Sequence, residues 1–131
     1  MERPAVPEAQ GATVWIDATR PAAGWRLWGM TLVERLLREA ARRGLRQAEI
    51  CVTPATAAPV SGWRSDLARL HGVDVRLVEV VDSAAAYRRL AEASGPTLVL
   101  EGDVVVDDRV LDHLLDAGPD VVVTGDNAAA A

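Results

Sequence analysis

The segment Thr97-Leu-Val-Leu-Glu-Gly-Asp-Val-Val-Val-Asp-Asp-Arg-Val-Leu111 joins an apolar run to a carboxylate and then to the start of an amphipathic helix. The run from Leu98 to Leu100 is unbroken, which is typical of a strand that is covered on both faces. Ligands of open α/β sheets collect at the carboxyl ends of the strands. Asp103 lies just past such an end, so it is our first candidate for a functional residue.

Two further aspartates in this segment have a structural explanation. Asp107 can cap the following helix, because its side chain can accept a hydrogen bond from a free amide of the first turn. Asp108 favours the positive end of the same helix. Asp103 lies too early to cap a helix that begins near Asp108. Two interpretations of Asp103 therefore stay open: a functional carboxylate, and an ordinary turn residue that needs no ligand.

Strand-like and helix-like segments alternate along the whole chain. We expect strands at residues 13–17, 48–53, 73–81, 98–100 and 120–124, helices at 30–44, 63–71, 82–93 and 108–116, and loops at 18–29 and 54–59. In the helix over 82–93, Tyr87, Leu90 and Ala91 are expected to face inward. Such alternation predicts an α/β fold with three layers, in which a mostly parallel, Rossmann-like sheet of about five strands has helices on both faces.

Length and composition indicate a single domain. The chain has 131 residues and is 50% hydrophobic, enough to bury one core. We expect a flexible leader over residues 1–10 and one domain over 11–131, truncated at its C-terminus. No apolar run is long enough to cross a bilayer, and the first residues lack a signal-peptide pattern, so a cytoplasmic location is expected. The single cysteine, Cys51, lies in an apolar segment and is predicted to be buried.

The charged residues exclude some functions. A net charge of -5 argues against a nucleic-acid surface, which needs basic side chains to neutralise phosphates. All 14 basic residues are arginine, whose planar guanidinium can still bind phosphate through two hydrogen bonds. His71 and His113 have no cysteine or second histidine at ligand spacing, which argues against zinc.

Two stretches carry a resemblance to a known family. They are Trp28-Gly-Met-Thr-Leu-Val-Glu-Arg-Leu-Leu37 and Leu98-Val-Leu-Glu-Gly-Asp103. Together they resemble the nucleotidyltransferases that activate sugar or polyol phosphates with a nucleoside triphosphate, whose nucleotide-diphospho-sugar transferase fold is glycosyltransferase-A-like. The resemblance implies that Asp103 holds the Mg²⁺ ion. It also implies CTP as the favoured nucleotide, and a phosphorylated small molecule that attacks its α-phosphate while pyrophosphate leaves. No side chain is implied as a nucleophile.

The loop after the first predicted strand departs from this family. It reads Asp17-Ala-Thr-Arg-Pro-Ala-Ala-Gly-Trp-Arg26, with one glycine and no lysine, where the family has a glycine-rich loop and a Lys-Pro pair. A phosphate cradle needs close approach of the backbone, which side chains hinder. The resemblance still implies a nucleotide-binding set in this loop: Ala18, Thr19, Arg20, Gly24 and Arg26. In the helix opening, Thr31 replaces the family's proline, and the second metal-binding aspartate of the family falls beyond Ala131.

The alternative is a degenerate, catalytically inactive module for scaffolding or interaction. The chain also resembles the cytidylyltransferase-like portion that precedes CDP-alcohol phosphatidyltransferases, which implies a membrane-protein partner or a fused membrane domain. Exposed Trp25, Trp28 or Trp63 would suit a partner surface. A dinucleotide-binding domain is disfavoured because the Gly-x-Gly-x-x-Gly turn is absent. The sequence leaves open whether the domain is an enzyme, and its oligomeric state.

Overall fold

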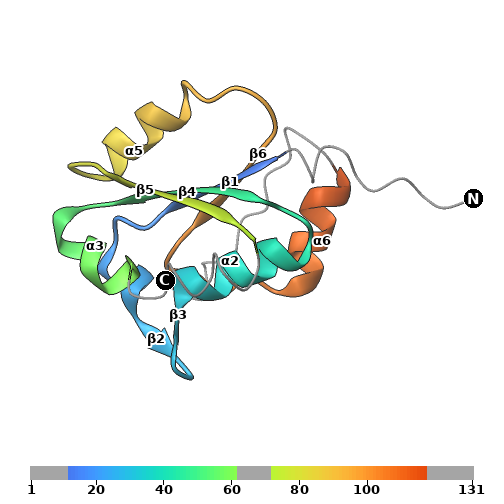
Figure 1. The fold of residues 1–131 in the computed structure, drawn as a ribbon, viewed down its shortest axis with the longest axis horizontal. Helices are drawn as coiled ribbons and strands as arrows, with labels where there is room; N and C mark the ends of the chain where they lie inside the picture. Colours follow the sequence, from blue (N-terminus) through green and yellow to red (C-terminus); the bar gives the residue numbers. More distant parts are fainter. Residues whose placement is uncertain (1–11, 62–71, 118–131) are drawn as a thin grey trace, which may run out of the picture.

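A four-stranded parallel sheet forms the centre of the molecule. The computed structural model describes residues 12–61 and 72–117. Within these ranges the sheet has the order β5-β4-β1-β6 (Figure 1). Its strands are β1 (Thr13–Asp17), β4 (Gln47–Val52), β5 (Asp74–Glu79) and β6 (Thr97–Glu101). A short antiparallel hairpin of β2 (Arg26–Leu27) and β3 (Met30–Thr31) stands apart from it.

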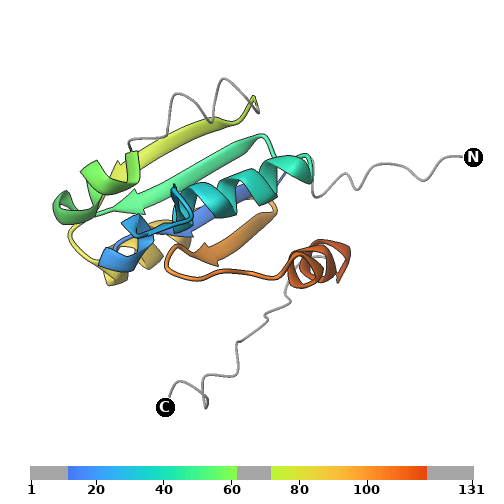
Figure 2. The same cartoon turned by 90° about the horizontal axis from the view of Figure 1, so that it is seen from below.

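Helices cover both faces of the sheet. Figures 1 and 2 show α5 (Ser83–Leu90) on one face, and α2 (Leu32–Arg42), α3 (Pro54–Ser61) and α6 (Asp108–Ala117) on the other. The predicted three-layer α/β fold with a parallel sheet is thereby confirmed. The strand expected at 120–124 and the helix expected at 63–71 lie outside the described residues. Within those residues, no helix has the length and apolar character needed to cross a bilayer.

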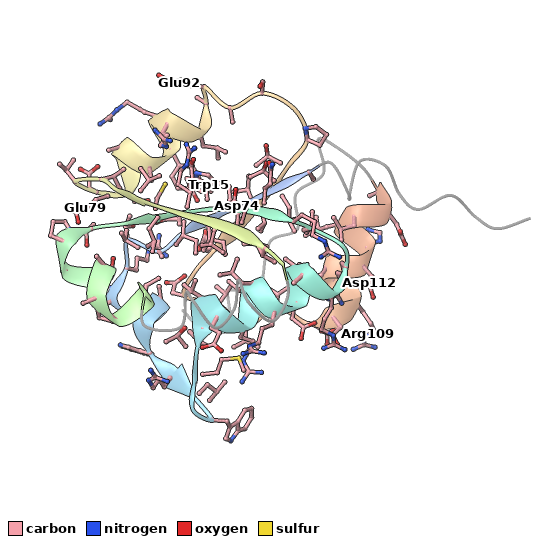
Figure 3. All side chains as sticks on the ribbon, viewed as in Figure 1. Trp15, Asp74, Glu79, Glu92, Arg109 and Asp112 are labelled. Carbon is pink, nitrogen blue, oxygen red and sulfur yellow. The ribbon has the colours of Figure 1, made fainter. Side chains whose placement is uncertain are left out.

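Alternate side chains of β1 pack against the helices on opposite faces of the sheet. Val14 and Ile16, 1% and 0% exposed, belong to the main core beneath α2. Trp15 belongs to a second cluster beneath α5, together with Cys51 and Ala86, and lies between helix and sheet in Figure 3. Burial raises the pKa of the Cys51 thiol to about 11. Cys51 is 0% exposed, which confirms the predicted buried cysteine.

The long helix α2 begins at a threonine cap. The Thr31 hydroxyl oxygen accepts a hydrogen bond from the backbone N–H of Glu34 at 3.0 Å, which is the standard role of an N-cap. The helix therefore starts two residues later than the sequence pattern predicts, because Met30 and Thr31 belong to β3. At its other end, Arg43 Nε donates to Asp112 Oδ1 at 2.7 Å and so joins α2 to α6.

The prediction of a loop over residues 54–59 is wrong, because this segment is α3. Pro54 stands at the first helical position, where a missing N–H has no cost. The Thr53 carbonyl accepts from the N–H groups of Thr56 and Ala57, at 3.0 and 2.9 Å, and so closes the first turn. The segment also contains three alanines, the residue with the highest helix propensity. These local effects outweigh the two prolines that suggest a break.

The predicted loop over residues 18–29 also contains regular structure, the 3-10 turn η1 (Pro21–Gly24) and the first strand of the β2–β3 hairpin. The prediction of α5 is right at its start, where Asp82 Oδ1 accepts from Ala85 N at 2.8 Å, but the helix ends at Leu90. Of the three residues expected to face inward, Leu90 is partly buried against the Trp15 cluster, Tyr87 is 40% exposed and Ala91 is exposed. The fully buried residue of the helix is Ala86. The predicted cap of α6 is present, since Asp107 Oδ1 accepts from Arg109 N at 2.8 Å.

Candidate functional site at the carboxyl end of the sheet

Asp103 follows the end of β6, at the point where β6 lies beside β1. The two strands are parallel, with Asp17 opposite Glu101. The backbone N–H of Gly102 then donates to the Asp17 carbonyl at 2.7 Å. A Cβ atom on Gly102 would lie 2.8 Å from that same oxygen, closer than side-chain carbons come in real structures. The absence of a side chain at Gly102 thus allows the ends of β1 and β6 to approach each other. This approach fixes the position of Asp103.

Arg20 contacts both carboxylates at this end. Its Nη1 atom lies 3.4 Å from Asp103 Oδ2 and 3.5 Å from Glu101 Oε2. These carboxylates, Asp103 first, raise the pKa of the Arg20 guanidinium. The Arg20 side chain is 58% exposed, whereas that of Asp103 is 19% exposed. The structure therefore brings together two residues that the sequence placed in the site, a carboxylate and an exposed cationic side chain.

Asp17 holds the loop that carries Arg20. Its carboxylate is buried, with Oδ1 accepting from the Thr19 backbone N–H at 3.0 Å and from the Thr19 hydroxyl at 2.6 Å. The other oxygen, Oδ2, accepts from the Ser83 hydroxyl at 2.7 Å. One side chain thus joins the loop after β1 to the first residue of α5. Sequence reasoning missed Asp17, although an acidic residue that ends a buried strand is the same signal that singled out Asp103.

Several backbone amides of this loop are satisfied within the protein. Ala18 N donates to Cys51 O at 2.8 Å, Ala23 N to Arg20 O at 3.0 Å, and Trp25 N to Ala22 O at 3.0 Å. Thr19 N is bound to Asp17, as described above. These amides are not free to form the phosphate cradle of the family that the sequence resembles.

The remaining two residues of the proposed nucleotide set have structural contacts. Gly24 ends η1 against α3, where a Cβ atom would lie 2.6 Å from Pro59 Cβ. Arg26 lies on the hairpin, and its Nη1 donates to the Gly29 carbonyl at 2.8 Å. Of this loop, Arg20 is therefore the residue seen in contact with Asp103.

Tyr87 borders this end of the sheet from the side of α5. Its ring centroid lies 5.0 Å from that of Trp15, with a tilted geometry. Burial is the main cause that raises the pKa of Tyr87, and the carboxylates of Asp17 and Glu101 raise it further. Its hydroxyl therefore keeps its proton at neutral pH and can donate a hydrogen bond.

The chemistry of the carboxylates suits Mg²⁺ only in part. Mg²⁺ prefers oxygen ligands and usually keeps several waters or phosphate oxygens beside one or two carboxylates. Asp103 and Glu101 supply such oxygens, although both contact Arg20. In residues 12–61 and 72–117, no group of three acidic, histidine or cysteine side chains is arranged to hold a metal. These two carboxylates therefore suit a Mg²⁺ ion that takes its other ligands from phosphate or water. They do not suit an ion that is enclosed by protein side chains.

The α/β architecture of the described residues is shared with solved structures of nucleotidyltransferases. In particular, the chain is similar to the inositol-1-phosphate CTP transferase from T. maritima, with a TM-score of 0.60 and 15% identity over 86% of this chain and 51% of that one. It is also similar to the 4-diphosphocytidyl-2C-methyl-D-erythritol synthase from Anaerococcus prevotii DSM 20548, with a TM-score of 0.60 and 11% identity over 83% and 51%. The chain thus spans about half the length of each. No family model matches the sequence, and no curated protein does.

Proposed function

We propose that this chain is a nucleotidyltransferase-like domain that binds a nucleoside triphosphate, with CTP favoured, together with Mg²⁺. It would transfer the nucleotidyl group to a sugar or polyol phosphate. The observation that carries the proposal is the contact between Arg20 and Asp103 at the carboxyl end of the sheet. The two solved structures with a similar fold bear the names of a CTP transferase and of a diphosphocytidyl-methylerythritol synthase, which supports the choice of CTP. A cytoplasmic location belongs to the same proposal.

The proposed roles follow from the chemistry of each side chain. Asp103 would hold Mg²⁺, with Glu101 beside it, and the ion would offset charge on the phosphates when bound. Arg20 would bind phosphate oxygens through its planar guanidinium. Ala18, Thr19, Gly24 and Arg26 belong to the loop that carries and shapes this contact.

Positioning and charge stabilisation are therefore the contributions that we assign to the protein. Asp17 supports both, because its carboxylate fixes Thr19 next to Arg20 and its carbonyl fixes Gly102 next to Asp103. No side chain has to form a covalent intermediate, since the phosphorylated acceptor itself supplies the attacking oxygen.

Calorimetric titration with CTP, GTP, ATP and UTP in the presence of MgCl₂ tests the proposal. The protein is used as it exists, with any segments that precede or follow this chain. We expect saturable binding of CTP that weakens when EDTA removes the metal. Absence of heat with all four nucleotides would overturn the proposal.

A second candidate function is an inactive interaction module, favoured by the hairpin. Trp28 is 87% exposed and Trp25 is 65% exposed, and the guanidinium carbon of Arg35 lies 5.7 Å from the centre of the Trp28 ring. Large exposed aromatic side chains are enriched where proteins bind partners. The partner that the second resemblance implies is a membrane protein or a fused membrane domain. Loss of function in the whole protein with Trp28→Ala, but not with Asp103→Asn, would favour this candidate.

A further inference from the structure

We propose that Arg20 is an internal counterion of Asp103 and Glu101, which keeps a divalent cation off these carboxylates until a nucleotide's phosphates take up the guanidinium. The inference rests on the proposed function, because it concerns the regulation of the same site. Its consequence is that metal and nucleotide bind together rather than independently.

The geometry supports competition between Arg20 and a cation. A single nitrogen atom, Nη1, lies within 3.5 Å of an oxygen of both Asp103 and Glu101. A Mg²⁺ ion binds a carboxylate oxygen at about 2.0–2.1 Å, so an ion on the side of these oxygens that faces Arg20 would lie against Nη1. A doubly charged ion next to a guanidinium is also repelled by it. Displacement of Arg20 therefore favours a cation at these oxygens.

The structure also shows why Arg20 can move while the carboxylate stays. The Arg20 side chain is 58% exposed, and exposed ion pairs are weak because water and salt screen them. The backbone on both sides of the contact is fixed, by the bond from Thr19 N to Asp17 Oδ1 and by the bond from Gly102 N to Asp17 O. A rotation of the Arg20 side chain alone is thus enough to make the carboxylates of Asp103 and Glu101 accessible to a cation.

Phosphate is the ligand whose chemistry fits this exchange. A triphosphate offers several charged oxygens, and guanidinium–phosphate hydrogen bonds are among the stronger ones in proteins. Once phosphates bind Arg20, the carboxylates of Asp103 and Glu101 have lost their counterion. This loss favours the binding of a cation. Because coupling between two ligands is reciprocal, the metal must raise the affinity for the nucleotide by the same factor.

Mn²⁺ binding, followed by electron paramagnetic resonance, tests the inference without an activity assay. Wild type and Arg20→Gln are titrated with Mn²⁺ in the absence of nucleotide. We expect Arg20→Gln to bind Mn²⁺ about tenfold more tightly, within the usual range of coupling factors. Arg20→Gln/Asp103→Asn should lose this gain. Arg109→Gln, which removes an exposed arginine of α6 that pairs with Asp107, is the matched control and should bind as wild type does.

Equal Mn²⁺ affinity of wild type and Arg20→Gln would overturn the inference. Thermal unfolding of each variant checks that it is folded, and Arg20→Met provides a second neutral replacement if the glutamine variant is not. The outcome is separable from that of the proposed function. If wild type binds no nucleotide, the proposed function fails, whereas a gain in Mn²⁺ affinity on loss of Arg20 would still support the counterion role.

Discussion

The carbonyl oxygen of Asp17 accepts a hydrogen bond of 2.7 Å from the backbone N–H of Gly102, and this contact brings together the two strand ends that carry the site. Arg20 follows one of these ends and Asp103 follows the other. The same residue, Asp17, uses its side chain to bind Thr19 and Ser83. The arrangement of the site thus depends on a small number of polar contacts around one buried aspartate.

Gly102→Ala tests the close approach of these strands. The added carbon would lie 2.8 Å from Asp17 O and 3.1 Å from a methyl carbon of each of Ile16 and Val33, so the strand ends must separate. We expect a loss of about 1–3 kcal/mol in the free energy of unfolding, which is typical of overpacking. Urea denaturation measures it. Ala91→Ser, at an exposed position, should change it by less than about 0.5 kcal/mol. Equal stability of Gly102→Ala and wild type would contradict the packing.

Asp17→Ala and Asp17→Asn separate packing from charge at the buried carboxylate. In Asp17→Ala, the Thr19 amide and the Ser83 hydroxyl lose their acceptor, and we expect a loss of about 2–3 kcal/mol in the free energy of unfolding. Asp17→Asn should lose less, since its oxygen can still accept from Thr19 and the Ser83 hydroxyl can turn to accept from the amide. Urea denaturation of both variants measures this order. Equal losses in the two variants would show that the negative charge, which both remove, is what stabilises the fold, and a larger loss in Asp17→Asn would contradict the account.

The reactivity of Cys51 should depend on folding. It is the one cysteine of the sequence, and its pKa is raised from 9.0 to about 11 by burial. The unfolded chain therefore loses this proton at lower pH than the folded one, so stability falls as the pH rises from about 9 to about 11. At pH 8 we expect Ellman's reagent to react slowly with the native protein and rapidly in urea. Fast stoichiometric reaction of the native protein would contradict the burial.

Trp15 and Trp28 should differ strongly in their effect on stability. Trp15 is 2% exposed and packs beneath α5, whereas Trp28 is 87% exposed. We expect Trp15→Ala to reduce the free energy of unfolding by about 3–5 kcal/mol, as deletion of a buried aromatic residue does. Trp28→Ala should reduce it by less than about 1 kcal/mol, because its contact with Arg35 is an exposed cation–π interaction. Thermal or urea unfolding of the two variants measures this difference in the free energy of unfolding.

Hydrophobic pattern and local caps made most of the fold predictable. The bounds predicted for β1 are those observed, and β4 is displaced by one residue. The sequence pattern does not predict the helix α3, because a segment of small residues between two prolines is typical of a loop. The capping contacts that favour the helix depend on how Thr53 leaves β4.

The positions of the candidate site residues were predictable only where the topology of the sheet alone decides them. Asp103 follows from the rule on strand ends, but the role of Asp17 depends on Ser83, which lies 66 residues away along the chain. That contact exists because α5 packs over the end of β1. Such tertiary packing cannot be predicted from the local sequence pattern. The pairing of Arg20 with Glu101 and Asp103 depends on the path of the loop after β1 in the same way.

The most direct measurement compares the affinity for CTP, with MgCl₂ present, of wild type and Asp103→Asn by calorimetry. Asp74→Asn is the control, because Asp74 is exposed at the start of β5 and so lies at the opposite end of the parallel sheet (Figure 3). We predict that Asp103→Asn loses the Mg²⁺-dependent part of CTP binding while Asp74→Asn keeps it, with both variants folded. Unchanged Mg²⁺-dependent binding in Asp103→Asn would contradict the proposed site.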